Sequence, residues 1–336
     1  MMTDFTFPTL RSIAFTSLAS SIALLPAVAT AQDVVANLNH EMTGTIIDQA
    51  VQRMSENLED ETDGRIQIKV HSRGEMGGER DMLDLMQVGA IEMGVSGAAI
   101  ISAIAPEFGM LDAPYLFQSS EHLDTVMDGS IGDELKQTIL ERKGIRIINK
   151  MDRAPRHLTT GGKEVRTPED LKGLKIRLRE IPVQIQAFRE MGASPVPMAF
   201  GEVYSALQTG VLDAQENPLD IIMGTSIDEV QETVTLTGHV RELQWLAVSD
   251  IWWSTISEDD QELIQAAADD AMSWGQEQIY SANADLLEEA RASGLTIIEL
   301  TPEQRAVFAR SLVELPSFFE DVWKEGVYEQ IVAAGE

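Results

Sequence analysis

The sequence predicts an α/β fold, because short strands alternate with amphipathic helices along most of the chain. "RIQIKVH" at 65–71 alternates apolar and polar residues, which is typical of a strand with one buried face. "GERDMLDLMQVGA" at 78–90 spaces its apolar residues as a helix does. Strands that alternate with helices of this length indicate mostly parallel sheets.

The first half of the chain contains four predicted strands and as many helical regions. The predicted strands are 33–40, 65–71, 91–97 and 145–151. The predicted helices are 41–63, 78–90, a piece that begins at 100, and 121–144 in two parts. Gly64 ends the first of these helices, as glycine often does.

The second half repeats this alternation. Thr167 is expected to cap a helical turn, with Pro168 at its first position. Thr301 and Gln304 form a capping box for the last helix. The predicted strands are 174–178, 194–198, 211–216 and 296–300, and the other predicted helices are 182–191, 200–209 and 257–294.

The helix predicted at 257–294 bears on the domain organisation. It begins at Ser257, a good N-cap, and at 1.5 Å per residue it is about 55 Å long. That length exceeds one small domain, so we expect this helix to lie across two. No Gly/Ser-rich linker, internal repeat or low-complexity tract divides the chain. We therefore expect the chain to cross between two domains several times.

The first 31 residues have the pattern of a secretory signal peptide. Arg11 precedes an apolar run, and Ala-Thr-Ala follows, which predicts cleavage after Ala31 and export. The alternative is an N-terminal membrane anchor. The run is shorter than the ~20 residues that span a bilayer, and Pro26 interrupts it, so the signal peptide is favoured.

Composition excludes several functions. With 25 Lys and Arg against 55 Asp and Glu, the net charge of -30 argues against binding nucleic acid or an anionic membrane surface. There is no cysteine, hence no disulfide and no thiolate zinc site. The five histidines form no H-x-x-x-H motif, "GVSGA" lacks the second glycine of a nucleophile elbow, and no phosphate-binding glycine loop occurs. The sequence therefore predicts no metal, no cofactor and no enzyme.

Positive charge is nevertheless concentrated in "GLKIRLREIP" at 173–182. Lys175, Arg177 and Arg179 alternate with two apolar residues, which predicts a strand with a cationic edge and an apolar face. Arg177 lies near the end of strand 174–178, and Asn217 follows strand 211–216. Ligands of open α/β sheets bind at the carboxyl ends of strands, so both side chains are expected to face one crevice.

The segment 168–219 resembles the substrate-binding proteins of tripartite ATP-independent periplasmic (TRAP) transporters, the DctP-like family. The matching words are "TPEDLKGLKIR", "MGASPVPMAFGEVYSALQTGVLDAQENPLD" and, further on, "EVQETVTLTGHV". Weaker matches are "GEMGGERDMLDLMQVGAIEM", "APYLF" and "WWSTISEDDQELIQAAA". Together they extend over most of the mature chain.

The resemblance implies a two-domain periplasmic binding protein of the Venus flytrap type, with a long helix spanning both domains. It implies closure on a small organic acid, and delivery to the small and large membrane subunits of a sodium-driven transporter. The expected division is a signal peptide at 1–31, domain I at 32–154 and 243–282, and domain II at 155–242 and 283–336, with the ligand cleft between the domains.

The resemblance also implies roles for four residues. Arg177 is expected to pair with the ligand carboxylate, since a guanidinium meets a carboxylate through two parallel hydrogen bonds. Asn217 is expected to fix that pair, and Phe200 to pack on the ligand. Arg156, before the threonine-rich turn, is expected to add a second contact.

Other positions are weaker candidates or stay open. His40, Ser96 and Trp245 lie at or near the ends of predicted strands, where capping or packing is the alternative role. Lys175 is expected to be solvated. Arg179 in "REIP" and Arg241 after "TGHV" stand where family members often have other residues, so their roles are left open.

The leading hypothesis is a receptor for a hydroxylated acid such as a uronate or another sugar acid, with C4-dicarboxylates and keto acids next. Two other hypotheses are the receptor of an ATP-driven importer and an exported enzyme, such as a lyase acting on acids. Genes for two membrane subunits of unequal size beside this one favour the first hypothesis, and an ATPase gene favours the second. Turnover of a tightly bound acid would favour the enzyme.

Overall fold

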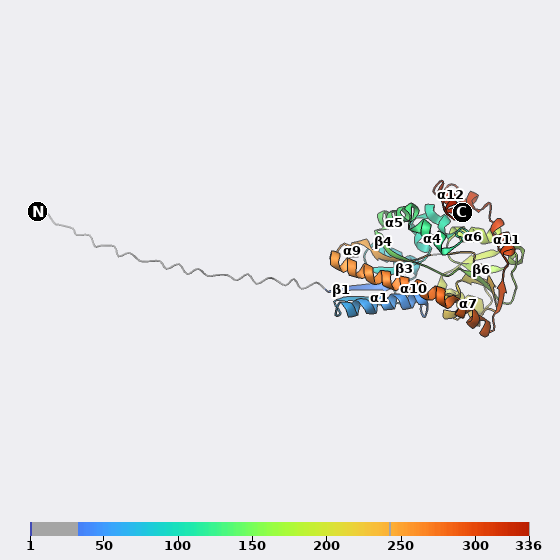
Figure 1. Cartoon of the computed structure of the whole chain (residues 1–336), viewed down its shortest axis with the longest axis horizontal. Helices are drawn as coiled ribbons and strands as arrows, with labels where there is room; N and C mark the ends of the chain where they lie inside the picture. The colour runs from blue at the N-terminus through green and yellow to red at the C-terminus, as the bar shows by residue number, and fades with distance from the viewer. Residues whose placement is uncertain (2–32, 242, 336) are drawn as a thin grey trace. The chain divides into compact units, whose positions relative to one another are not determined.

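The structure is a computed structural model that describes residue 1, residues 33–241 and residues 243–335 (Figure 1). The signal peptide predicted at 1–31 and its cleavage after Ala31 concern residues 2–32, which lie outside the described residues. All elements below belong to the unit Asp33–Glu336.

The first sheet has five strands in the order β2-β1-β3-β10-β4. Its strands are β1 (Val34–Asn39), β2 (Ile66–His71), β3 (Met93–Ser96), β4 (Ile145–Asp152) and β10 (Leu243–Ser249). β1 runs parallel to β2 and β3, whereas β10 runs antiparallel to β3 and β4. The helices in this part of the chain are α1 (Ile46–Glu61), α2 (Glu79–Gln87), α3 (Ala99–Ile104), η1 (Pro106–Asp112), α4 (Ser120–Met127), α5 (Ser130–Lys143) and α9 (Asp250–Trp253).

The second sheet has six strands in the order β11-β9-β5-β8-β6-β7. Its strands are β5 (His157–Thr160), β6 (Lys175–Leu178), β7 (Ser194–Pro197), β8 (Ala214–Asn217), β9 (Thr233–Leu236) and β11 (Thr296–Glu299). β5 runs antiparallel to β8 and β9, and the other pairs are parallel. The helices in this part are η2 (Pro168–Leu171), α6 (Pro182–Glu190), η3 (Phe200–Glu202), α7 (Val203–Gln208), α8 (Leu219–Gly224), η4 (Ile227–Glu229), α11 (Pro302–Arg310), η5 (Leu315–Phe319) and α12 (Val327–Ala334).

One long helix, α10 (Glu258–Ala292), packs on elements of both sheets (Figure 1). The side chain of Ser257 accepts a hydrogen bond from the Asp260 N–H and caps its start. α10 contacts α1 and strand β4 of the first sheet, and α8 and strand β11 of the second. A Cβ at Gly275 would lie 2.8 Å from Met151 Sδ and 3.1 Å from Ala50 Cβ, so glycine allows the close approach of α10 to α1 and β4.

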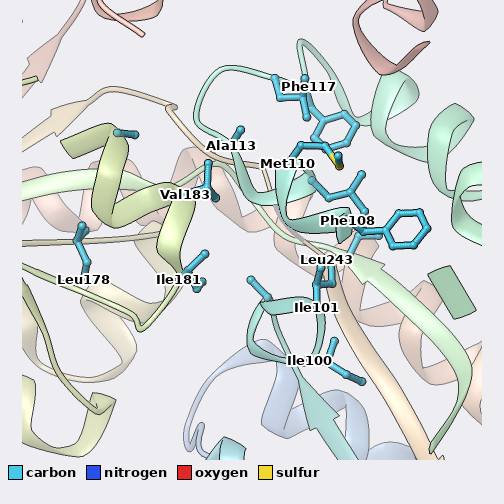
Figure 2. Packing of buried hydrophobic residues seen from close by; sticks show 14 of the residues in the cluster. Ile100, Ile101, Phe108, Met110, Ala113, Phe117, Leu178, Ile181, Val183 and Leu243 are labelled. Atoms are coloured by element: carbon cyan, nitrogen blue, oxygen red, sulfur yellow. The ribbon is translucent and has the colours of Figure 1, made fainter. Parts of the chain in front are cut away.

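The largest apolar cluster joins side chains from elements beside both sheets. Figure 2 shows Phe108 and Met110 of η1 on one side and Leu178, Ile181 and Val183 on the other. η1 packs on both α3 and α6. Two further apolar clusters lie under α1 and α10 and around α7 and α8. Close packing of this kind fixes the strand ends that carry the polar residues described next.

The predicted α/β class with a long helix is confirmed, with three differences in detail. Both sheets are mixed rather than mostly parallel, because the strands that follow the two short crossings between sheets, β5 and β10, run antiparallel to their neighbours. The strands at 157–160, 233–236 and 243–249 were not predicted; the first two are four residues long and rich in threonine. β8 begins later than predicted and includes Asn217. The division of the chain into domains I and II stays a prediction.

Candidate ligand-binding site

A cavity of about 270 Å³ is lined by residues of both sheets and of the loops that follow their strands. From the first sheet and its helices come His40, Glu41, Glu79 and Arg153. From the second come Arg156, Arg177, Arg179, Phe200 and Asn217. Five of the seven residues predicted for the site therefore lie around one cavity.

Arg177 is held at the cavity by its place near the carboxyl end of β6, on the same face of the strand as Lys175, which begins it. Lys175 is exposed, as predicted, whereas Arg177, two residues on, is only 2% exposed. Its Nε donates to the Met198 carbonyl at 2.9 Å, and the Phe200 ring lies 5.7 Å from its Cζ. Its Nη1 and Nη2 make no hydrogen bond to any described residue. The outer edge of the guanidinium is therefore available to an anion.

Electrostatics at Arg177 reflect its burial. Removal from water lowers the pKa of Arg177, the charge of Glu216 opposes this, and the charges of Arg156 and Arg179 add to the lowering, so that the pKa is about 10. The group stays charged at neutral pH. A bound carboxylate would offset the neighbouring positive charge.

Arg156 is already paired with a buried carboxylate. Its Nε donates to Glu216 Oε2 at 2.5 Å and its Nη2 to Glu216 Oε1 at 2.9 Å, a two-point contact with a fully buried side chain. Burial alone raises the pKa of Glu216, but the charge of Arg156 and hydrogen bonds from His239 and Arg156 hold it well below its usual range. The positive charge of Arg156 is thus largely neutralised inside the protein.

Asn217 is placed on Arg156 rather than on Arg177. Its Oδ1 accepts from Arg156 Nη2 at 2.9 Å, and its Nδ2 donates to Gln215 Oε1 at 2.5 Å. Among the described residues it makes no hydrogen bond to Arg177. The role of Asn217 in fixing the pair between Arg177 and the ligand carboxylate stays a prediction. In this geometry, Asn217 would act on that pair through Arg156.

His40 lines the cavity where β1 ends. Its Nε2 lies 3.3 Å from Asp48 Oδ1. Burial lowers the pKa of His40 from its usual value, and the charge of Asp48 opposes this effect. The ring is therefore a neutral, polar part of the wall at pH 7.

Ser96 and Trp245 are not among the residues that line the cavity. Trp245 is buried in the apolar cluster, and its neighbour Gln244 lines the cavity instead, because side chains alternate along β10. Ser96 Oγ donates to Glu79 Oε1 at 2.6 Å and so supports a residue that does line it.

Two carboxylates on the first-sheet side were missed by sequence reasoning. Glu79, the first residue of α2, accepts hydrogen bonds on Oε1 from Ser96 Oγ and from the Gly97 N–H at 2.5 Å. Glu41 accepts on Oε1 from the Glu79 N–H at 3.0 Å. Burial raises the pKa of Glu79 from its usual value, and the charge of Glu41 raises it further, while Arg179 partly compensates. The position of Glu79, at a helix start after a strand and loop, was the signal available in the sequence.

Arg179, whose role the sequence left open, also lines the cavity. It is half-buried, and its Nη2 donates to Gln184 Oε1 at 3.2 Å. Arg241 does not line the cavity and donates to Ser120 Oγ at 3.1 Å. In the described ranges, no three His, Asp or Glu side chains are grouped as metal ligands. No helix in those ranges is long and apolar enough to cross a membrane.

Two mixed sheets joined by a long helix, with buried arginine side chains around a shared cavity, define a solute-binding protein. Residues 38–320 match the family model DctP, described as bacterial extracellular solute-binding protein, family 7. A solute-binding protein of Roseobacter denitrificans is 34% identical over 90% of this chain and 95% of its own length. The chain therefore belongs to the DctP family of TRAP solute-binding proteins, which are receptors and not enzymes.

Relatives and solved structures agree on the fold. The structure of the Roseobacter protein with bound L-galactonate has a TM-score of 0.82 at 31% identity, covering 91% of this chain and all of that one. The 2,3-diketo-L-gulonate-binding periplasmic protein YiaO of Escherichia coli is 30% identical over 78% of this chain and 79% of its own length. A TRAP solute-binding protein of Sulfurospirillum deleyianum with bound succinate has a TM-score of 0.85 at 26% identity, covering 90% of this chain and 99% of that one.

Proposed function

We propose that this protein is an extracytoplasmic receptor that binds a small organic acid, with a sugar acid favoured, and delivers it to the small and large membrane subunits of a TRAP transporter. The observation that carries the proposal is the guanidinium of Arg177, which is buried, fixed through Nε and open on its outer edge. A C4-dicarboxylate or a keto acid is the next choice of ligand.

A carboxylate fits the geometry and the charge of this guanidinium. Two oxygens can accept in parallel from Nη1 and Nη2, while the Nε contact to Met198 holds the plane. At an effective dielectric of ~20, unit charges 4 Å apart attract by about 4 kcal/mol before desolvation costs. Phe200 lies over the guanidinium and offers an apolar surface to the ligand.

The cavity and the relatives both favour a small ligand. A volume of about 270 Å³ lies just below the usual range of ligand pockets, about 300–1,000 Å³. The Roseobacter structure holds L-galactonate, the Escherichia coli protein is named for 2,3-diketo-L-gulonate, and the Sulfurospirillum structure holds succinate. All three are carboxylates, and two carry several oxygens along the chain.

The proposal also includes export of the protein and closure of its two domains on the ligand. The family is described as extracellular, which supports cleavage of the signal peptide after Ala31 and a periplasmic location. We place domain I at 32–154 and 243–282 and domain II at 155–242 and 283–336. Closure of these domains on the ligand would exclude water and strengthen the contact with Arg177.

A binding screen tests this function. The chain from residue 32 onward is mixed with sugar acids, C4-dicarboxylates and keto acids, and the melting temperature is recorded. A ligand at 100 times its Kd should stabilise the fold by roughly 2.7 kcal/mol. Calorimetry on the best acid should then show that Arg177→Ala weakens binding by more than tenfold, with an unchanged circular dichroism spectrum. No stabilising acid, or an Arg177→Ala variant that binds normally, would contradict the proposal.

A further inference from the structure

Charge is distributed unequally around the cavity. We call Arg156, Arg177 and Arg179, which all come from the second sheet and its loops, the arginine wall. We call Glu41 and Glu79, from the first sheet's side, the acidic wall. The acidic wall is the part of the cavity to which the proposed function assigns no role.

The other charged residues around the cavity do not cancel this asymmetry. Arg153 Nη2 lies 3.7 Å from Asp220 Oδ2, so it faces a carboxylate of its own. Arg80 and Glu180 are exposed and pair with each other at 3.5 Å. Asp81 is exposed and adds negative charge on the side of Glu79.

Both residues of the acidic wall are anchored through one oxygen. Glu79 uses Oε1 for Ser96 and Gly97, and Glu41 uses Oε1 for the Glu79 N–H. Their Oε2 atoms make no hydrogen bond to any described residue. This is the arrangement seen at Arg177, with the signs reversed: one atom fixes the group, and another is left to meet a ligand.

We propose that Glu41 and Glu79 make the receptor select hydroxylated monocarboxylates and reject dicarboxylates. This inference rests on the proposed function, because it assumes that the ligand carboxylate is bound by Arg177. Hydroxyl groups at the other end of such a ligand donate to the open oxygens of Glu41 and Glu79. A second carboxylate there has no proton to donate and meets two groups of its own sign.

Arg179 does not turn the acidic wall into a second carboxylate site. Its Nη2 is engaged by Gln184, and its charge is opposed locally by Glu79. Burial and the charge of Glu41 raise the pKa of Glu79 above its usual value, because together they outweigh the hydrogen bonds from Ser96 and Gly97 and the charge of Arg179. Where Glu79 is ionised, a further negative charge would add to the repulsion that already acts on it.

The test compares acids that differ only at their far end. Oxidising the terminal CH₂OH of either D- or L-galactonate gives the same dicarboxylate, galactarate, which therefore serves as the partner of both enantiomers. D-gluconate with D-glucarate, and D-erythronate with meso-tartrate, are two further pairs, and succinate serves as a dicarboxylate without hydroxyls. Calorimetry at pH 7.5 should show that the monocarboxylate of any bound pair binds at least tenfold more tightly than its dicarboxylate.

Substitutions in the acidic wall test whether the preference for monocarboxylates arises there. In Glu79→Gln, the amide oxygen still accepts from Ser96 and Gly97 but the charge is gone, so the preference should fall at least fivefold. Glu41→Gln should act in the same direction and serves if the first variant is unstable. Asp84→Asn is the matched control: it removes one charge from the same helix at an exposed position paired with Lys143, and should leave the preference within twofold.

The outcomes separate the two proposals. A wild-type protein that binds galactarate, glucarate, meso-tartrate or succinate as tightly as the monocarboxylates would overturn the inference and leave the carboxylate receptor intact. A preference that survives both Glu79→Gln and Glu41→Gln unchanged would overturn it as well. Failure of every acid to bind would remove the proposed function and the inference together.

Discussion

The two walls of the cavity differ in the partners that the protein provides for their charged side chains. In the arginine wall, the buried carboxylate of Glu216 pairs with Arg156, whereas the outer edge of the Arg177 guanidinium stays open. In the acidic wall, hydrogen bonds from Ser96 and main-chain N–H groups hold the carboxylates, and no comparable buried cation is paired with them among the described residues. One wall is suited to fix the class of ligand, and the other to choose within that class.

Both walls hold charge that the protein itself disfavours. Burial and neighbouring arginines lower the pKa of Arg177 to about 10, and burial and Glu41 raise the pKa of Glu79. Each group would therefore be stabilised by a further partner: an anion beside Arg177, and a hydrogen-bond donor beside Glu79. A hydroxylated acid that reaches both walls supplies an anion to one and proton donors to the other.

The largest expected effect concerns the internal pair of the arginine wall. Glu216→Gln keeps the volume of the side chain but leaves Arg156 as a buried charge without its carboxylate. We expect the free energy of unfolding to fall by about 3–5 kcal/mol in urea denaturation at pH 7. Glu164→Gln, which breaks an exposed pair with Arg166 at 3.1 Å, is the control and should cost about 1 kcal/mol or less. A similarly small loss in the free energy of unfolding for Glu216→Gln would show that the Arg156–Glu216 pair is dispensable for stability.

The pH dependence of the same variant has a defined sign. The folded-state pKa of Glu216 lies below its usual value, so its ionised form is favoured in the folded state. Its contribution to stability is full above the usual pKa of glutamate and is lost as the pH falls toward the folded-state value. The stability difference between wild type and Glu216→Gln should therefore stay constant from pH 7 to about 5 and shrink below that.

The next effect separates Arg177 from its neighbour. Arg177→Lys keeps the charge but loses both the Nε contact to Met198 and the second parallel donor. We expect the affinity for the best acid to fall by more than tenfold, with little change in stability. Lys175→Ala, on the exposed end of the same strand, should leave the affinity unchanged in calorimetry. Equal affinities for Arg177→Lys and wild type would mean that charge alone, and not the planar fork, holds the ligand.

The arginine wall could be anticipated because its signals are local in sequence. The alternation in "GLKIRLREIP" marks a strand with Arg177 near its carboxyl end, and strand ends bring Arg177 and Asn217 to one cavity. The partner of Arg156 could not be anticipated in the same way. Glu216 was part of "QENP", but its burial depends on the antiparallel pairing of β5 with β8, which no local pattern in the sequence indicates.

The acidic wall was hidden for a different reason. Glu79 stands in a helix that the sequence predicted well, yet acidic residues at helix starts are usually solvated. Only the fold shows that Ser96 and Gly97 enclose its side chain. Trp245 illustrates the opposite case: it lies one position away from Gln244, which lines the cavity, because the register of β10 is set by pairing with β3 and β4.

A further prediction concerns His157, which lies beside the arginine wall. Burial, and then the charges of His239, Arg305 and other nearby cations, lower the pKa of His157 to about 3. The unfolded chain takes up a proton there below about 6.5, and the folded protein does not, so stability falls as the pH drops from 6.5 toward 3. One such group contributes at most about 1.4 kcal/mol per pH unit. In urea denaturation at pH 7, 6 and 5, His157→Gln should show a shallower decline than wild type, and parallel declines would contradict the assignment.

The smallest effect is expected where the two walls meet the solvent. Arg80 and Glu180 connect the acidic side with the loop after β6, but their side chains are 76% and 69% exposed and their N–O distance is 3.5 Å. Exposed pairs of this kind contribute about 0–1 kcal/mol and weaken with salt. Arg80→Ala should therefore change the affinity by less than threefold at 150 mM salt. A tenfold loss that disappears at 1 M salt would instead mean that this pair holds the cavity closed, and that selection depends on the rim as well as on the two walls.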